Sequence, residues 1–198
     1  MPSPIGHALA GIVVAWIADL PPSGHTRRPV SDTESLYLRA GGGLTLTCAA
    51  LAAAPDLDLA FTVHRTVTHS VGAVVAVGLC AAAISARLGR PIARTALTCA
   101  VAYGSHLLLD WLGVDRYPPI GIQALWPLNH EWYISGLDIF RQTARQRIFT
   151  RPIMLVNAKA VAQEIAILAP IALALWLVRV KAVARFAPEM ARSHHPPE

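Results

Sequence analysis

The sequence PDLDLAFTVHRTVTHS, residues 55–70, gathers polar side chains in an otherwise apolar part of the chain. It contains two carboxylates, Asp56 and Asp58, and then two imidazoles, His64 and His69. Aspartate and histidine are costly to bury singly, so their gathering beside long hydrophobic segments indicates one shared site. Carboxylate oxygens and imidazole nitrogens are common metal ligands, and the stretch therefore predicts a metal site between membrane segments.

The composition of the 198-residue chain is that of a membrane protein. Hydrophobic residues make up 54% and charged residues 15%, the mean hydropathy is +0.45, and the apolar residues come in blocks. The formal net charge of +5 does not require nucleic acid as a partner, because arginines that flank membrane segments explain it. We expect an integral membrane protein, mostly helical, with no nucleic-acid partner.

Apolar segments separated by polar or basic turns predict an all-α fold, a polytopic membrane helical bundle with about four to five membrane segments. The segments cover residues 5–20, 44–54, 71–86, 96–112 and 152–178. The second is short, so it either spans together with residues 57–63 or forms a re-entrant piece buried in protein. We expect one membrane-embedded domain over residues 1–198, in which 113–152 form a long extramembrane loop and 186–198 a frayed tail.

Segments that cross the membrane alternately would bring their polar residues to one end of the bundle. From the first segment to the last, these residues are His7, Asp56, Asp58, His69, Asp110 and Glu164. All of them fall at one membrane level, opposite the basic turn at residues 87–94, and Asp19 is the exception. This agreement predicts that they form one site.

The distribution of basic residues predicts the orientation of the chain. More of them lie on the face of the basic turn at residues 87–94 than on the face of the site. Most of those on the site face belong to the single long loop, where the positive-inside rule counts less. We therefore expect the C-terminus in the cytoplasm and the site on the extracytoplasmic face.

His106 and Asp110 stand one helical turn apart and share a face of their segment. The pair suits two ligands of one ion, or a ligand with its orienting carboxylate. The alternative is a buried histidine–aspartate hydrogen bond that packs two helices. His64 and His69 instead fit a loop that runs into a helix capped by Thr68, and the alternative there is a polar loop without a ligand.

The full set of candidate metal ligands is His7, Asp56, Asp58, His64, His69, His106 and Asp110. Carboxylates and imidazoles without a thiolate favour a divalent metal, with Zn²⁺ the first choice and Mn²⁺ or Fe as alternatives. Taken alone, Asp56 and Asp58 after Pro55 would be turn residues, and His7 would be a helix-end histidine. The chain has no glycine-rich phosphate loop, G-x-S-x-G or H-E-x-x-H motif.

The motifs in this order resemble a known family. They are PIGH at residues 4–7, PDLD at 55–58, HRTVTHS at 64–70 and HLLLD at 106–110. Together they resemble the LexA-associated, YdjM-like proteins of the bacterial inner membrane, over roughly residues 4–127. The resemblance implies a multi-pass inner-membrane protein that acts as a metal-dependent hydrolase.

A fainter similarity is to zinc-dependent phospholipase C and the single-strand nucleases. Those enzymes also have an early Gly-His, then an Asp, a His and an H-x-x-x-D helix. This chain lacks their N-terminal tryptophan, whose amine binds metal, and it has no second H-x-x-x-D/E helix. We therefore expect one or two ions in place of a larger cluster.

The leading hypothesis is a membrane-bound hydrolase that uses a metal to cleave phosphoester bonds in lipid or lipid-linked substrates. In it, Asp56 or Asp58 would act as the base and Arg65 would hold a phosphate. One alternative is a non-enzymatic membrane protein with a structural or transported metal. The other is a regulatory protein that binds a partner on the loop at residues 113–152.

Overall fold

The computed structural model describes residues 1–20, 41–60 and 64–192, with side chains up to residue 178. Within these ranges the chain is all-α, as predicted, with five α-helices, two short 3-10 helices and no strand. In chain order the elements are α1 (Pro4–Ala18), α3 (Gly42–Ala53), η1 (Ala54–Ala60), η2 (Val67–His69), α4 (Val71–Arg87), α5 (Ile92–Leu112) and α6 (Arg151–Arg192).

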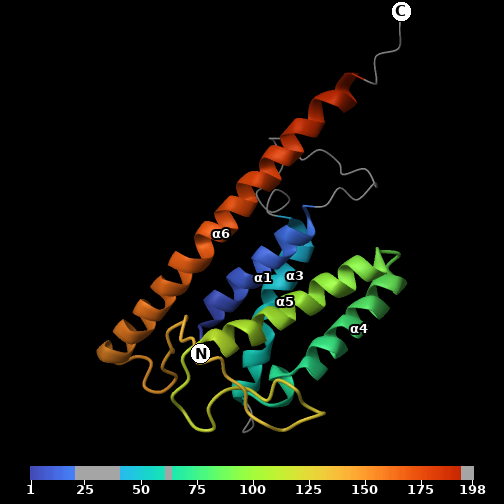
Figure 1. Cartoon of the computed structure of the whole chain (residues 1–198). Coiled ribbons are helices and arrows are strands. Elements are labelled where there is room, and N and C mark those ends of the chain that lie inside the picture. The colour runs from blue at the N-terminus through green and yellow to red at the C-terminus, as the bar shows by residue number, and fades with distance from the viewer. Residues whose placement is uncertain (21–40, 61–63, 193–198) are drawn as a thin grey trace, which may run out of the picture.

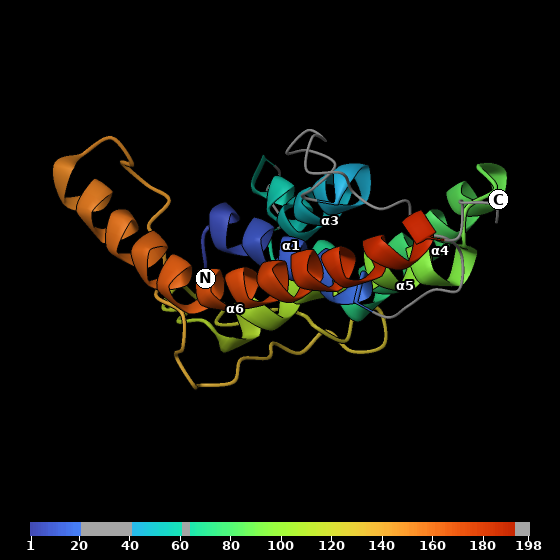
Figure 2. The ribbon, with the colours of Figure 1, turned by 90° about the horizontal axis from the view of Figure 1, so that it is seen from above.

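The helices form a bundle around α1 and α5 (Figure 1). α1 packs against α3, α5 and α6, while α5 packs against α1, α3 and α4. The N-terminus lies at the end of the bundle where α6 begins, and the last turns of α6 lie at the opposite end (Figure 1). Figure 2 shows that the first turns of α6 project beyond the other helices. This up-and-down arrangement is the one that alternating apolar segments predict.

Small residues allow α1 to approach its neighbours closely. A Cβ atom on Gly11 would lie 2.3 Å from the backbone oxygen of Cys48 on α3, so only glycine fits there. Ala10 and Ala15 are buried on the same helix. Close packing through small residues is typical of helices in membranes, where the lipid gives no hydrophobic force between them. It brings the histidine on α1 against the helix that carries the H-x-x-x-D motif.

Two helix starts are fixed by serine caps. The hydroxyl of Ser3 accepts a hydrogen bond from the Gly6 backbone at 3.2 Å, at the start of α1. Ser70 caps α4 in the same way, accepting from Ala73 at 3.1 Å. The sequence had suggested Thr68 as the cap of α4, and this was wrong because the Thr68 hydroxyl donates to Asp58. Capping hydroxyls satisfy backbone N–H groups that the first turn leaves free.

The far end of the bundle is closed by an ion pair. Arg94 donates to the Asp19 carboxylate at 2.9 Å and to the Ala18 carbonyl at 2.8 Å. This contact joins the end of α1 to the first turn of α5, which begins at Ile92. The ion pair explains why Asp19 lies at the end of the bundle away from the site, as the exception that the sequence had indicated.

The outer surface of the bundle is apolar, as a membrane protein requires. Leu46, Leu79 and Leu97 are 60%, 67% and 65% exposed. By length and composition, three helical stretches can cross a membrane: Gly42–Ala60, Ile92–Leu112 and Arg151–Val178. Helices α1 and α4 are also apolar but shorter. Apolar side chains outside and polar ones inside make the protein a helical membrane bundle.

Two segments differ in extent from the sequence prediction. α3 and η1 together give the stretch at 44–54 enough length to span, while residues 61–63 lie outside the described residues. α6 continues as helical backbone to Arg192, past the start of the predicted frayed tail. Each added residue of a helix gains a backbone hydrogen bond, so a helix can continue beyond its apolar part.

Residues 113–150 form an irregular layer below the helix ends, on the side of η1 and η2 (Figure 1). Ile122 and Phe140 from this layer are buried. Short backbone pairings hold it, between Ile122 and Tyr133 and between Gly113 and Phe140. The predicted long loop is therefore an ordered cover over the end of the bundle where the polar residues meet.

Candidate metal centre

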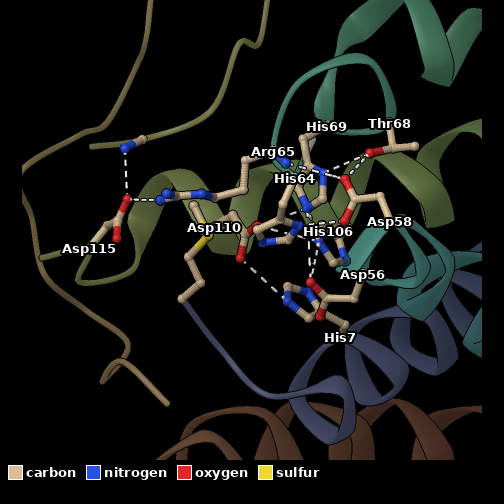
Figure 3. Close-up of polar contacts among 12 residues, drawn as sticks. His7, Asp56, Asp58, His64, Arg65, Thr68, His69, His106, Asp110 and Asp115 are labelled. Atoms are coloured by element: carbon tan, nitrogen blue, oxygen red, sulfur yellow. Dashed lines mark hydrogen bonds and ion pairs between the residues drawn. The ribbon is translucent and has the colours of Figure 1, made fainter. Parts of the chain in front are cut away.

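The structure brings all of the predicted ligand residues to one place (Figure 3). The Nε2 atoms of His69 and His106 are 3.0 Å apart, although one lies on η2 and the other on α5. Asp110 Oδ2 lies 3.5 Å from His69 Nε2 and 3.3 Å from His106 Nε2. His7, from α1, places its Nε2 3.4 Å from Asp110 Oδ1. The prediction that these residues cluster is confirmed.

The cluster divides into two triads. His7, His106 and Asp110 form the buried triad, and Asp56, His64 and His69 form the open triad. Within each triad, the ligand atoms lie within 4.8 Å of one another. Asp56 Oδ1 lies 3.9 Å from the Nε2 atoms of both His69 and His106, so the triads are direct neighbours. Two adjacent sets of imidazole and carboxylate donors can hold one or two divalent ions.

Burial separates the triads. His7 and His106 are fully buried and Asp110 is 1% exposed. The rings of His7 and His106 stack with their centroids 3.6 Å apart, between α1 and α5. In the open triad, Asp56 and His64 are only partly buried. The open triad is therefore the more accessible of the two, although its His69 is fully buried, and Arg145 from residues 113–150 contacts it.

Hydrogen bonds fix which nitrogen of each central histidine carries a proton. His106 Nδ1 lies 2.7 Å from the Ala52 carbonyl, which can only accept, so this nitrogen donates. His69 Nδ1 lies 3.2 Å from Asp58 Oδ2 and 3.0 Å from the Thr68 hydroxyl, whose own proton goes to Asp58. Both neutral rings then direct an Nε2 lone pair at the other, which requires a proton or a metal ion between them.

Several buried polar atoms at the centre have no hydrogen-bond partner among the described residues. They are both ring nitrogens of His7, both carboxylate oxygens of Asp110 and Oδ1 of Asp56. A single shared proton would not satisfy so many atoms, and unpaired buried polar groups are costly. Burial lowers the pKa of His69, against the opposing effect of Asp58, and this favours the neutral imidazole that a metal binds. The donor set fits a divalent metal ion.

Asp58 has a different place from the other carboxylates. It accepts from His64 Nδ1, His69 Nδ1 and the Thr68 hydroxyl, and its Oδ2 accepts from the Arg65 backbone at 3.2 Å. A carboxylate that binds the far nitrogen of a ligand histidine orients the ring and raises its basicity. Asp58 belongs to neither triad, and its geometry is that of a positioning residue for both histidines of the open triad.

Arg65 turns its guanidinium away from the histidines, toward Asp115 (Figure 3). It forms an ion pair with Asp115 and donates to the Tyr117 carbonyl at 3.1 Å. Asp115 also accepts from the Gly121 backbone at 2.8 Å. The Arg65 guanidinium lies 5.9 Å from the centre of the Trp132 ring. These contacts fasten the covering loop to the segment before η2. They also engage the Arg65 guanidinium, so it is not free for the phosphate that the sequence predicted it would hold.

Arg145 is the charged neighbour that sequence reasoning did not single out. Its Nη1 contacts His64 Nε2, and its Nη2 lies 3.8 Å from Asp56 Oδ1. Asn157 on α6 holds the preceding residue, Ala144, with backbone contacts of 2.7 Å and 3.0 Å. The sequence shows Arg145 only as one of several arginines in the long loop, so no local signal marked it.

Glu164 on α6 fixes the start of α1. Its carboxylate accepts from the Ser3 backbone at 2.8 Å and from the Ser3 hydroxyl. A Cβ atom on Gly6 would lie 2.6 Å from Glu164 Oε2, so the glycine leaves room for this contact. Glu164 is fully buried and contacts neither triad in the described interactions. It determines where His7 meets the site.

The fold and the site define the class: a helical membrane protein with a buried histidine–aspartate cluster at one end of its bundle. The family model described as the YdjM inner membrane protein matches residues 1–185. The chain belongs to this family and is a multi-pass inner-membrane protein. Neither the curated proteins nor the solved structures contain a match. The similarity to zinc-dependent phospholipase C and the single-strand nucleases stays a prediction.

Proposed function

We propose that this protein is a metal-dependent hydrolase of phosphoester bonds in lipid or lipid-linked molecules. The observation that carries the proposal is the pair of adjacent triads, whose ligand atoms lie close together and include buried nitrogens and carboxylate oxygens without a hydrogen bond among the described residues. Zn²⁺ suits this donor set best, with Mn²⁺ or Fe²⁺ as alternatives. The buried triad and the open triad would hold the metal, and Asp58 would orient His64 and His69.

A bound divalent ion supplies positive charge for the phosphoryl oxygens and lowers the pKa of water at the site. The chain's own residues would supply the general base and the phosphate contacts. Asp56 Oδ1 has no hydrogen-bond partner and lies on the open side, so it is placed to accept a proton from the attacking water. Asp58 is already engaged by several donors, which makes it the weaker candidate for the base.

Arg145 is placed to hold the phosphate. Its guanidinium contacts His64 and Asp56 from the open side, whereas the guanidinium of Arg65 is engaged by Asp115. A guanidinium forms charge-assisted, bidentate contacts with phosphate oxygens. When substrate binds, Arg145 would exchange its contacts with His64 and Asp56 for phosphate oxygens. This assigns to Arg145 the role that the sequence gave to Arg65.

The site lies at one end of the bundle, and in this proposal that end stands at the level of the lipid headgroups. We place this end on the extracytoplasmic side, from the excess of basic residues at the other end. A fluorescent protein that folds only in the cytoplasm, fused after Glu198, should then fluoresce. Fluorescence lost there and recovered when the reporter is fused before Met1 would reverse the orientation.

Turnover of a defined lipid tests the activity. Purified protein in nanodiscs of phosphatidylethanolamine and phosphatidylglycerol, with a polyprenyl phosphate added, is supplied with Zn²⁺, Mn²⁺ or Fe²⁺ in turn. We expect release of phosphate or of a phosphorylated headgroup with metal and none with a chelator. Cys80→Ala, an exposed position on α4, should match the wild type. Metal binding without turnover of any of these lipids would contradict the hydrolase.

A structural or transported metal is the second candidate. The observation in its favour is the complete burial of His7 and His106 between α1 and α5, where an ion would join two helices. Chelation would then destabilise the protein although no substrate is turned over. Uptake of radioactive zinc into vesicles would separate transport from a structural role. The third hypothesis, a partner bound on the long loop, has no contact in its favour and stays a prediction.

A further inference from the structure

A large basic groove lies beside the proposed active site. It has a volume of about 680 Å³ and runs between the covering loop and the start of α6. Its cationic lining residues are Arg116, Arg141 and Lys159, and no acidic side chain of the described chain lines it. Three like charges around one groove raise the local concentration of anions. The groove is large enough for a lipid headgroup.

These three cations have no ion-pair partner among the described residues. The backbones of the two arginines are nevertheless held in place: Arg116 N donates to Gln142 at 3.2 Å, and Arg141 N donates to Gln163 at 3.0 Å. The side chains of all three are exposed. Arg65, by contrast, is neutralised by Asp115. Fixed backbones with free charged side chains make a site that is prepared for an anion.

A smaller cavity lies between the groove and Arg145. This cavity, of about 50 Å³, is lined by Arg65 and Arg145 and shares Tyr117, Gln142 and Thr143 with the groove. Arg145 in turn contacts the open triad through His64. A single molecule with two anionic groups can therefore reach both the groove and Arg145.

The far wall of the groove is the start of α6, which carries exposed apolar side chains. Val156 lines it, and the neighbouring Met154 and Leu155 are 56% and 54% exposed. Lys159 lies near the beginning of the candidate membrane span Arg151–Val178. An ammonium among exposed apolar side chains is suited to a headgroup whose hydrocarbon chain lies along α6. This favours a lipid over a soluble anion.

We propose that this groove is a second anion subsite and that the substrate is a lipid with two phosphate groups, such as a lipid diphosphate. One phosphate occupies the triads and Arg145, and the other is held by Arg116, Arg141 and Lys159. The inference rests on the proposed hydrolase function for the meaning of the first position. The second position can be tested by binding alone, without metal and without turnover.

The test compares two ligands with the same hydrocarbon chain, farnesyl phosphate and farnesyl diphosphate. Binding to the full-length, metal-free protein in detergent is measured by calorimetry. We expect the diphosphate to bind about tenfold more tightly, as one added set of charge-assisted contacts allows. In the double variant Arg141→Gln/Lys159→Gln, this preference should fall to about twofold or less while the affinity for the monophosphate stays unchanged.

Arg147→Gln/Arg151→Gln is the matched control, because it removes the same two positive charges from exposed residues that do not line the groove. It should keep the full preference for the diphosphate. An equal loss in this control would assign the effect to general surface charge and overturn the subsite. Equal binding of both farnesyl ligands by the wild type would also overturn it. Inorganic diphosphate binding as tightly as farnesyl diphosphate would overturn the lipid assignment.

The two failures are distinguishable. A protein that prefers the diphosphate but never turns over a lipid would contradict the proposed hydrolase and leave the subsite intact. A protein that hydrolyses lipid phosphoesters with metal but binds both farnesyl ligands equally would contradict the subsite alone. Circular dichroism on the double variant confirms that it is folded before its binding is compared with the wild type.

Discussion

The buried triad and the open triad have the same ligand types, two histidines and one aspartate, but different supports. The buried triad comes from α1 and α5, and it assembles only when these helices pack. The open triad comes from η1, η2 and the segment between them, and its outer side meets Arg145 from the covering loop. We infer that the buried triad couples metal binding to folding and that the open triad faces the substrate.

The largest effect should follow from Asp56→Asn. This change keeps the shape of the side chain but removes the carboxylate that would ligate metal and accept the proton. Turnover should fall by about 10³-fold or more, as loss of a catalytic base together with a metal ligand requires. The melting temperature should change little, because Asp56 is on the open side. Phosphate release and differential scanning fluorimetry measure the two quantities.

Leu57→Ala is the neighbouring control for this prediction. Leu57 lies on the same 3-10 helix, is 72% exposed and faces outward. Its turnover should stay within about twofold of the wild type. Comparable losses in both variants would mean that η1 as a whole was disturbed and that Asp56 has no chemical role of its own.

Removal of metal should have the next largest effect, and it should act through the buried triad. An ion at about 1,000 times its Kd stabilises the folded protein by about 4 kcal/mol. For a chain of this size, chelation should lower the melting temperature by about 10 °C. His7→Ala should abolish most of this chelator effect, whereas His64→Ala should retain a larger part. Thermal melts with and without a chelator measure it for each variant.

Cys80→Ala should show the full chelator effect of the wild type. If His7→Ala and His64→Ala lost the same part of the chelator effect, the inference that metal stabilises the fold mainly through the buried triad would be wrong. An unchanged response in both variants would place the metal outside this cluster. In either case, the melting temperature of each variant without metal serves as its own baseline.

The ligand cluster could be predicted from the sequence because it depends on where each residue stands along its apolar segment. Apolar segments alternate in direction, so residues near the ends of consecutive segments meet at one level, as His7, His69 and Asp110 do. The spacing of His106 and Asp110 fixes a common helix face. The fold class followed from the same apolar blocks, and the α-helices begin and end close to the expected residues, except that α6 continues to Arg192.

The roles inside the cluster depended on contacts that sequence spacing does not encode. Asp58 orients histidines because η1 places it beside His64 and His69, and nothing in the motif distinguishes it from Asp56. Arg65 and Arg145 differ only in their partners. The covering loop supplies the partner of Arg65 and carries Arg145 itself. Its path is irregular and set by tertiary contacts such as that of Asn157 with Ala144.

A smaller effect should separate these two arginines. Arg145→Ala should reduce kcat/KM by about 10²-fold, the size expected for loss of one charge-assisted contact with phosphate. Arg145→Lys should recover part of it. Arg65→Ala should instead lower the melting temperature, because it leaves Asp115 buried without its cation. A loss of stability in Arg145→Ala equal to that in Arg65→Ala would make Arg145 structural.

The smallest effect concerns the support of the buried triad at Gly6. A Cβ atom there would lie 2.6 Å from Glu164 Oε2, and this carboxylate is buried and bonded to Ser3, so it cannot move without losing those contacts. Gly6→Ala should therefore cost about 1–3 kcal/mol, which lowers the melting temperature by a few degrees. It should weaken metal binding by displacing His7 on the next position of α1.

Gly104→Ala is the matched control, since Gly104 is also a helical glycine near the site. A Cβ atom on it would lie 3.6 Å from Val74, an ordinary contact, so the substitution should be neutral or slightly stabilising. Scanning fluorimetry and zinc titration compare the two variants. If Gly6→Ala and Gly104→Ala bound zinc alike, the link from Glu164 through α1 to the buried triad would be wrong, and His7 would be held by α5 alone.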